Sequence, residues 1–253
     1  MVRYPLGGNL SWALQYLLGL KELGHDVFFV EKAGYPDSCY NPLNREMSDD
    51  CSYGIKIILE LFVRFGLEKK WCFVDNNSNY WGLSKKELDE IFRTADLFID
   101  SGSHGNWAEE SLNSALRVLI EGEPAYTQMK WANNAAAGIP VPTYDHYFTN
   151  GRNVGIEGNQ IPTLNVKWGH VYSPVKTDLF SQAPVARDAS YSTIMNWRSH
   201  NPIQYNGNTY GQKDEEFKKF LSLHCVKFPE FRISKYGSIN KVYKLRYIPW
   251  FFH

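Results

Sequence analysis

The first 31 residues constrain the fold most, because they place a glycine turn, a helix and a strand in immediate succession. Residues 4–31 read YPLGGNLSWALQYLLGLKELGHDVFFVE. Apolar residues recur at helical spacing from Leu10, and Asn9 before them is a good N-cap. Gly24 supplies the left-handed residue that ends a helix, and the apolar run at 27–31 predicts a short buried strand. This order is half of a βαβ unit, which needs a strand before it, and only three residues precede the stretch 4–31.

Helices and short apolar strands continue to alternate along the next hundred residues or so. The segments at 53–67 and 84–95 follow helical spacing, and the second opens with the capping box Ser84-x-x-Glu87. Two further strands are predicted, DLFID at 96–100 and RVLIEGE at 117–123. This alternation predicts an α/β fold with a largely parallel sheet and helices on both faces.

Beyond residue 138 glycine and proline become frequent, which predicts short and irregular strands. A strand is predicted at 191–199, a hairpin around Asn206-Gly207 within 203–211, and an amphipathic helix at 213–223. A domain boundary is expected between residues 160 and 190. The expected organisation is an N-terminal domain at 1–180, the start of or a linker to a second domain at 181–224, and an atypical tail at 225–253.

Composition narrows the function classes. The 253 residues carry 27 basic and 27 acidic side chains, so no charge excess favours nucleic acid or an anionic membrane. No apolar run reaches the length of a membrane-spanning helix, and the four cysteines show no metal-binding spacing. Reduced thiols in a cytoplasmic protein are the simplest interpretation. The 15% aromatic content suits sugars and purines as well as cores.

The glycine turn does not match a dinucleotide fingerprint, because the G-x-G-x-x-G spacing is absent, which argues against NAD or FAD. Residues 4–31 instead resemble the first βα unit of two-domain glycosyltransferases of the GT-B type. The chain also resembles a bacterial group of such glycosyltransferases in DHYFTNGRNVG (145–155) and in NWRS and YNGNTYGQKDEEFKKFL (196–221). The resemblance extends over residues 4–224.

The resemblance implies a Rossmann-like N-terminal, acceptor-side half of a GT-B architecture. Such an enzyme transfers a sugar from a nucleotide-sugar donor to an acceptor, here unknown, without a metal or other cofactor. A member of the group would have a full first strand and a donor-binding second domain. We therefore expect a chain that lacks most of the first strand and is inactive alone. The alternatives are a non-catalytic nucleotide- or sugar-binding module and an inactive gene fragment.

Ligand-facing residues are expected at the carboxyl ends of parallel strands. His104, in a glycine-flanked loop after the strand at 96–100, is the first candidate for the general base, and Glu123 is the second. A loop histidine that only caps local backbone is the alternative for His104. In the related sequences DTDP stands where this chain has EGEP, which weakens Glu123. The expected substrate-binding residues are Gly7, Gly8, Asn9, Ser103, Asp145 and His146.

Other conspicuous residues are assigned to structure. His25 belongs to the turn after the first helix. Trp131, Trp168 and Trp197 could stack on sugar faces, but tryptophans at such positions more often belong to a core. Asp145 and His146 are not expected to form a catalytic dyad, because neighbours on a strand point to opposite faces.

Overall fold

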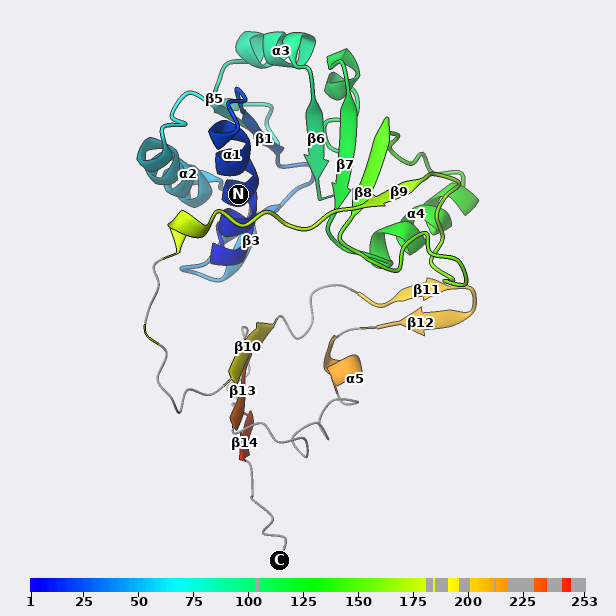
Figure 1. Cartoon of the computed structure of the whole chain (residues 1–253). Helices are drawn as coiled ribbons and strands as arrows, with labels where there is room; N and C mark the ends of the chain where they lie inside the picture. The colour runs from blue at the N-terminus through cyan, green and yellow to red at the C-terminus, as the bar shows by residue number, and fades with distance from the viewer. Residues whose placement is uncertain are drawn as a thin grey trace, which may run out of the picture. The chain divides into compact units, whose positions relative to one another are not determined.

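The computed structural model describes residues 1–102, 105–180, 184, 191–195, 201–211, 213–217, 230–235 and 243–246 (Figure 1). The chain divides into two compact units, Met1–Phe180 and Ser181–His253. His104 and Ser103, two of the expected site residues, lie outside the described residues.

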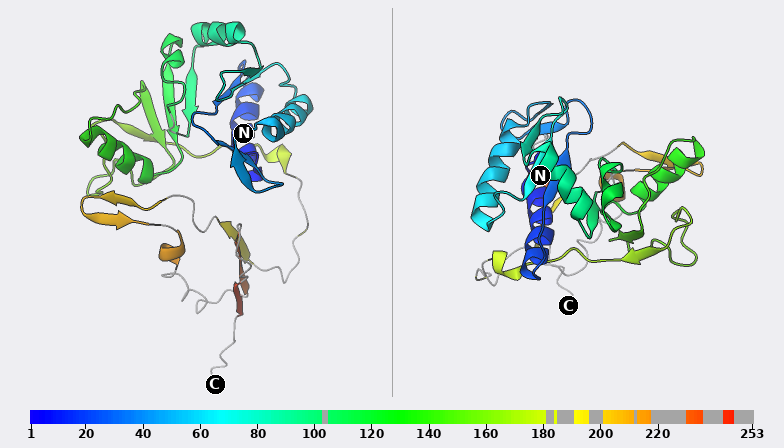
Figure 2. Two further views of the ribbon diagram at one scale, coloured as in Figure 1. Left: turned by 180° about the vertical axis from the view of Figure 1, so that it is seen from behind. Right: turned by 90° about the horizontal axis from the view of Figure 1, so that it is seen from above.

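The first unit contains two sheets that include parallel strands, with helices flanking them (Figures 1 and 2). One sheet has the order β1-β4-β5, in which β1 and β4 are parallel and β5 is antiparallel to β4. Its strands are β1 (Phe29–Lys32), β4 (Trp71–Val74) and β5 (Tyr80–Gly82). The chain between them forms a small antiparallel hairpin of β2 (Cys39–Asn41) and β3 (Glu46–Ser48).

The other sheet has four strands, all parallel, in the order β6-β7-β8-β9. They are β6 (Phe98–Ser101), β7 (Arg117–Glu121), β8 (His146–Thr149) and β9 (Trp168–His170). The helices are α1 (Gly7–Glu22), α2 (Ser52–Phe65), α3 (Lys85–Thr94) and α4 (Tyr126–Ala136), with short 3-10 helices at Glu110–Asn113 and Thr177–Leu179. The α/β class and the parallel sheet predicted from the alternation are therefore confirmed.

Several helix ends lie where the local sequence predicted them. Ser84 accepts the backbone N–H of Glu87 while the Glu87 carboxylate accepts the N–H of Ser84, so the predicted capping box opens α3. Gly24, with φ of +91°, follows the end of α1, and the N–H of His25 donates to Leu20. This is a Schellman motif, which agrees with a structural role for His25.

Asn9 is not the N-cap of α1. The helix begins at Gly7, two residues earlier than expected, after an extended Leu6 whose carbonyl accepts the N–H of Leu10. Asn9 instead donates from its side chain to the carbonyl of Tyr4 at 3.5 Å.

The second unit contains β10 (Tyr191–Met195), β13 (Glu230–Lys235) and β14 (Tyr243–Arg246), paired in that order. Its hairpin of β11 (Ile203–Tyr205) and β12 (Asn208–Tyr210) turns at Asn206 and Gly207, whose φ values of +47° and +75° fit the predicted type I′ turn. The helix α5 (Lys213–Phe217) matches the described part of the predicted helix.

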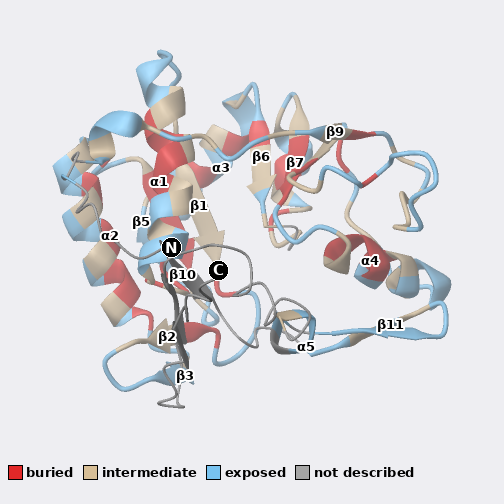
Figure 3. Ribbon diagram, turned by 60° about the horizontal axis from the view of Figure 1, so that its bottom comes forward, coloured by how far each residue is buried: buried red, intermediate tan, exposed pale blue. Residues whose placement is uncertain are grey.

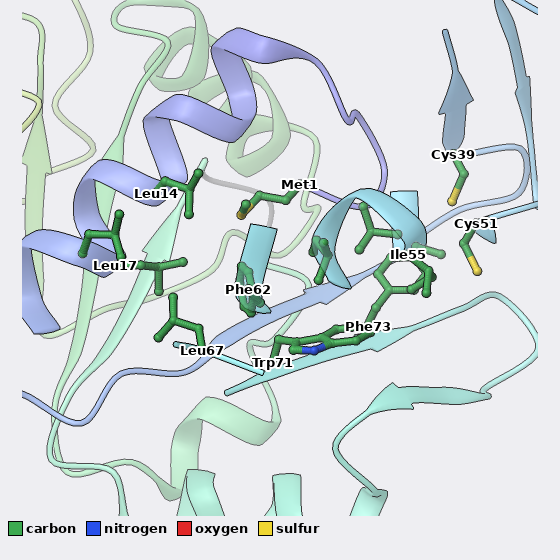
Figure 4. Close-up of a cluster of buried hydrophobic side chains, with 14 residues drawn as sticks. Met1, Leu14, Leu17, Cys39, Cys51, Ile55, Phe62, Leu67, Trp71 and Phe73 are labelled. Carbon is green, nitrogen blue, oxygen red and sulfur yellow. The ribbon is translucent and has the colours of Figure 1, made fainter. Parts of the chain in front are cut away.

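The first residues of the chain belong to the largest core cluster of unit 1. Met1 is 7% exposed and Val2 is 1% exposed. Figure 4 shows Met1 in the same cluster as Leu14 and Phe62, between α1, α2 and β4. A Cβ atom added to Gly54 would lie 2.1 Å from the carbonyl oxygen of Val2, so α2 can approach this segment only with glycine there.

We expect Gly54→Ala to destabilise the protein by about 2 kcal/mol, because the added methyl overlaps backbone atoms that cannot move independently. Gly19→Ala is the matched control: Gly19 is also helical, nothing lies within 4 Å of its added Cβ, and alanine there should stabilise by about 0.5–1 kcal/mol. Urea unfolding of both variants measures the two effects. Equal effects would contradict the close approach of Val2 to α2.

Candidate functional site

The carboxyl ends of β1 and β6 lie close together and define the candidate site. The Lys32 ammonium, at the end of β1, pairs with the Glu110 carboxylate at 2.5 Å and lies 4.3 Å from the ring centre of Trp107, and both partners follow β6. Beyond β1, a Cβ added to Gly34 would lie 2.8 Å from the side chain of Asn106. In open parallel sheets, ligands bind outside the carboxyl ends of the strands, which is where these side chains lie.

The first turn of α1 is open to solvent. Gly7, Gly8 and Asn9 are all exposed, and nothing lies within 4 Å of a Cβ added to either glycine. Neither glycine has a positive φ. Neither the backbone conformation nor internal packing therefore requires glycine at these two positions, whereas a ligand that approaches the backbone closely would require it.

Arg3 lies at the base of the same turn and is 6% exposed. Its guanidinium carbon lies 4.7 Å from the ring centre of Tyr35 and 5.7 Å from that of Tyr4. The Nε atom is buried without a hydrogen-bond partner, and Arg3 has no carboxylate partner among the described residues. A nearly buried guanidinium without a counter-ion is costly, and it is suited to binding an anion.

The two tyrosines beside Arg3 are joined by a hydrogen bond of 3.2 Å between their hydroxyl groups. Burial, followed by the bond to Tyr35, raises the pKa of Tyr4 to about 12. The Tyr4 hydroxyl is therefore neutral at physiological pH. Its backbone carbonyl accepts the N–H of Leu6 and the side chain of Asn9, which ties Arg3 and Tyr4 to the first turn of α1.

Of the two acids in the EGEP segment at 121–124, Glu121 is buried and Glu123 is exposed. Glu121 is 0% exposed at the end of β7, and its Oε2 accepts the hydroxyl of Thr149 at 2.7 Å and the amide of Gln128 at 3.4 Å. Its other oxygen accepts the N–H of Glu123. Gln128 in turn accepts the N–H of Ala125, a residue with φ of +71° at the start of α4. This network fixes the loop from β7 to α4.

Asp100 fixes the neighbouring loop after β6. Its Oδ2 accepts the hydroxyl of Tyr144 and the N–H of Gly105, the latter at 3.2 Å. Burial, followed by the charge of Asp100, raises the pKa of Tyr144, so this hydroxyl keeps its proton and donates. The backbone at Gly105 is therefore tied to the end of β6.

The structure separates the expected site residues into two groups. Gly7, Gly8 and Asn9 lie together, and Glu123 is exposed just beyond β7. Asp145 and His146 do not lie at a carboxyl end, which corrects their expected place. Asp145 accepts the N–H of Arg117 at 2.7 Å, at the amino ends of β7 and β8, because Asp145 directly precedes β8 and His146 is the first residue of this strand.

The two tryptophans that the structure describes belong to the core, as the sequence analysis favoured. Trp131 and Trp168 are 4% and 6% exposed and belong to one core cluster, whereas Trp197 lies outside the described residues. Cys39, Cys51 and Cys72 are buried free thiols, and burial raises the pKa of both Cys51 and Cys72 to about 11. These thiols are therefore protonated at neutral pH and poorly nucleophilic.

Sequence reasoning missed Arg3 and Glu121. Arg3 stands in the segment that was expected to be a remnant of a strand, and its burial depends on contacts with Tyr35 from a distant loop. For Glu121 a signal was present, since an acid that ends a buried apolar strand must lie at the carboxyl end of the sheet.

Among the described residues, no helix has the length and apolarity to cross a membrane, and no group of three or more His, Cys, Asp or Glu side chains is placed to hold a metal ion. Comparison of the chain with protein-family models, with curated proteins and with solved structures found no match.

We expect Glu121→Ala to cost about 3 kcal/mol of stability, because it leaves buried donors of Thr149 and Gln128 without an acceptor. Glu123→Ala is the control, two residues away and exposed, and it should stay within about 0.5 kcal/mol. Chemical denaturation distinguishes the two acids. Similar losses in both variants would show that the network around Glu121 does not hold the loop.

Proposed function

We propose that this chain is the acceptor-side part of a GT-B-like glycosyltransferase, which transfers a sugar from a nucleotide-sugar donor to an acceptor hydroxyl. The observation that carries the proposal is the open first turn of α1, where two glycines that the fold does not require stand beside an unpaired, buried Arg3. The contact of Arg3 and Tyr4 with Tyr35, which follows the carboxyl end of β1, and the resemblance of residues 4–31 support it further.

Charge on the donor is the first chemical requirement. A nucleotide-sugar donor loses a nucleoside diphosphate, and the negative charge that develops on it must be stabilised as the glycosidic bond forms. The first-turn N–H groups of α1 carry partial positive charge, and Arg3 adds a full charge nearby. Gly7 and Gly8 leave these N–H groups uncovered. We assign the diphosphate side of the reaction to this turn.

Removing the acceptor proton is the second requirement. A base needs to reach the acceptor hydroxyl and have a pKa near the working pH. Glu123 is exposed at the carboxyl end of β7, and His104, which lies outside the described residues, follows β6 in the sequence, so both remain candidates in the proposal. Glu121 holds three donors in a fully buried site and is assigned a positioning role.

The glycines provide the sharpest test. We expect the double variant Gly7→Ala, Gly8→Ala to be more stable by about 1 kcal/mol, because alanine loses less backbone entropy in a helix. The same variant should bind inorganic pyrophosphate roughly tenfold more weakly, through the added methyl groups over the N–H groups. Unfolding curves and NMR titration with pyrophosphate measure the two effects.

Gly19→Ala is the matched control for this test, since it makes the same change inside α1 with open space around it. It should gain stability and leave pyrophosphate binding unchanged. Arg3→Met keeps most of the side-chain volume and removes the charge, and it should abolish the pyrophosphate shifts at residues 7–9. If pyrophosphate shifts none of these amides in the parent chain, the assignment of the turn is wrong.

Turnover by the chain alone is a separate expectation. In a GT-B enzyme the donor lies mainly on a second α/β domain, and the rate depends on holding donor and acceptor together. We expect residues 1–253 to release no nucleoside diphosphate from a panel of UDP-, GDP-, ADP- and dTDP-sugars. Release of a nucleoside diphosphate by this chain would contradict the expectation that the donor lies mainly on a second domain.

A further inference from the structure

The loops that follow β7 and β8 pack against each other at the carboxyl ends of these strands. A Cβ atom added to Gly151 would lie 2.4 Å from the Cβ atom of Pro124, so the loops can approach this closely only with glycine there. The N–H of Gly151 donates to the Thr149 hydroxyl at 3.0 Å, and that hydroxyl donates to Glu121. Four of the five residues of β7 are buried, ending with Glu121, and Figure 3 shows this strand largely as buried. The buried network around Glu121 therefore also holds the loop after β8.

Asn150, the first residue of that loop, has a fixed backbone and an unpaired side chain. Its N–H donates to the carbonyl oxygen of Glu121 at 3.3 Å. Its side-chain oxygen Oδ1 is buried without a hydrogen-bond partner, and this side chain forms no hydrogen bond among the described residues. A buried polar atom without a partner is unfavourable and calls for one. A ligand hydroxyl would satisfy the amide, because a hydroxyl both donates and accepts.

Two residues after Asn150, the exposed Arg152 provides a positive charge. Its guanidinium carbon lies 5.5 Å from the ring centre of Tyr172, which follows β9 and is 74% exposed. In the part of the chain that the structure describes, Arg152 forms no ion pair. The loop is tied to β9 as well, since the carbonyl oxygen of the buried Val154 accepts a hydrogen bond from Nε2 of His170 at 3.0 Å.

These groups define the chemistry of a ligand. A guanidinium binds a carboxylate or a phosphate through two parallel N–H donors. The exposed ring of Tyr172 offers an apolar face beside that charge. The amide of Asn150 requires a hydroxyl. A molecule with hydroxyl groups, an apolar ring face and one anionic group has all three features, and an anionic sugar is such a molecule.

We propose that the loops after β7, β8 and β9 bind a sugar that carries a carboxylate or phosphate group, with Asn150 on a ring hydroxyl and Arg152 on the anionic group. The inference rests on the proposed function and specifies its acceptor as an anionic sugar. Glu123, the second candidate for the general base, directly precedes Pro124 and so belongs to the loop that packs against Gly151. A base that removes a proton from the acceptor needs to stand beside the acceptor in this way.

NMR titration of the full chain with glucuronate, glucose 6-phosphate and glucose tests the proposal. The amides of Gly151, Arg152 and Tyr172 should shift with at least one anionic sugar at concentrations roughly tenfold lower than with glucose, because only the anionic sugars pair with the guanidinium. Whichever anionic sugar binds more tightly identifies the anionic group as a carboxylate or a phosphate. Equal binding of all three sugars, or no shift at these amides, would overturn the proposal.

Two variants separate binding from folding. Asn150→Ala removes an amide that bonds to nothing within the described protein, so Tm should fall by no more than about 2 °C. The same variant should bind the anionic sugar roughly tenfold more weakly, since the sugar loses a hydrogen bond. Arg152→Met should reduce the affinity for the anionic sugar to that for glucose. Arg64→Met on α2 is the matched control, because the exposed Arg64 lies over the ring of Phe65 in the same way, at 5.4 Å, and it should leave binding unchanged.

This outcome is independent of the pyrophosphate test, which measures the amides of residues 7–9. Pyrophosphate shifts without sugar shifts would overturn the anionic acceptor and leave the diphosphate turn in place. Sugar shifts without pyrophosphate shifts would contradict the diphosphate turn and support a binding site for anionic sugars. A fall in Tm of about 5 °C or more in Asn150→Ala would show that this side chain supports the fold, and would overturn its assignment to a ligand.

Discussion

The carboxylate of Glu31 and the absent side chain of Gly54 hold the first residues of the chain in the core, and the geometry of the site depends on this anchoring. Glu31 accepts both the Met1 ammonium and the N–H of Val2, at 2.8 and 2.7 Å. The carbonyl of Arg3 accepts the N–H of Tyr40 at 2.7 Å. The strand β1, the helix α2 and the β2–β3 hairpin thus all contact residues 1–3, and these residues determine where α1 begins.

The same anchoring buries the positive charge of Arg3, which pairs with no carboxylate among the described residues. The bond from the Tyr40 N–H to the Arg3 carbonyl fixes the backbone from which the Arg3 side chain extends. The rings of Tyr4 and Tyr35 compensate part of the cost of burying the guanidinium, by about 1–2 kcal/mol for a desolvated cation–π contact. A buried unpaired charge costs several kcal/mol, so the rings alone do not balance it. An anion at the first turn of α1 would balance it, and this links the stability of the segment to the proposed diphosphate site.

Elements with a complete local signal could be predicted from the sequence, and those that depend on distant partners could not. The Ser84 capping box and the Asn206-Gly207 turn are closed by bonds within a few residues, so sequence alone located them. The strand β4 is a run of only four buried residues and forms by pairing with β1, about forty residues earlier. Within the site, the exposed Gly7 and Gly8 were found, but the burial of Arg3 and Glu121 arises from tertiary contacts.

The two acids of the EGEP segment show why burial decides between positioning and chemistry. Glu121 receives three donors in a site closed to water, so any movement toward a substrate would leave Thr149, Gln128 and the Glu123 N–H unpaired. Glu123 is exposed, and its backbone is held by the acid that precedes it. A rigid buried acid beneath an exposed one is the arrangement that lets a loop side chain meet a substrate in a fixed position. After β6, Asp100 has a comparable positioning role, because it accepts both the Tyr144 hydroxyl and the N–H of Gly105 and so ties the backbone at Gly105 to the end of the strand.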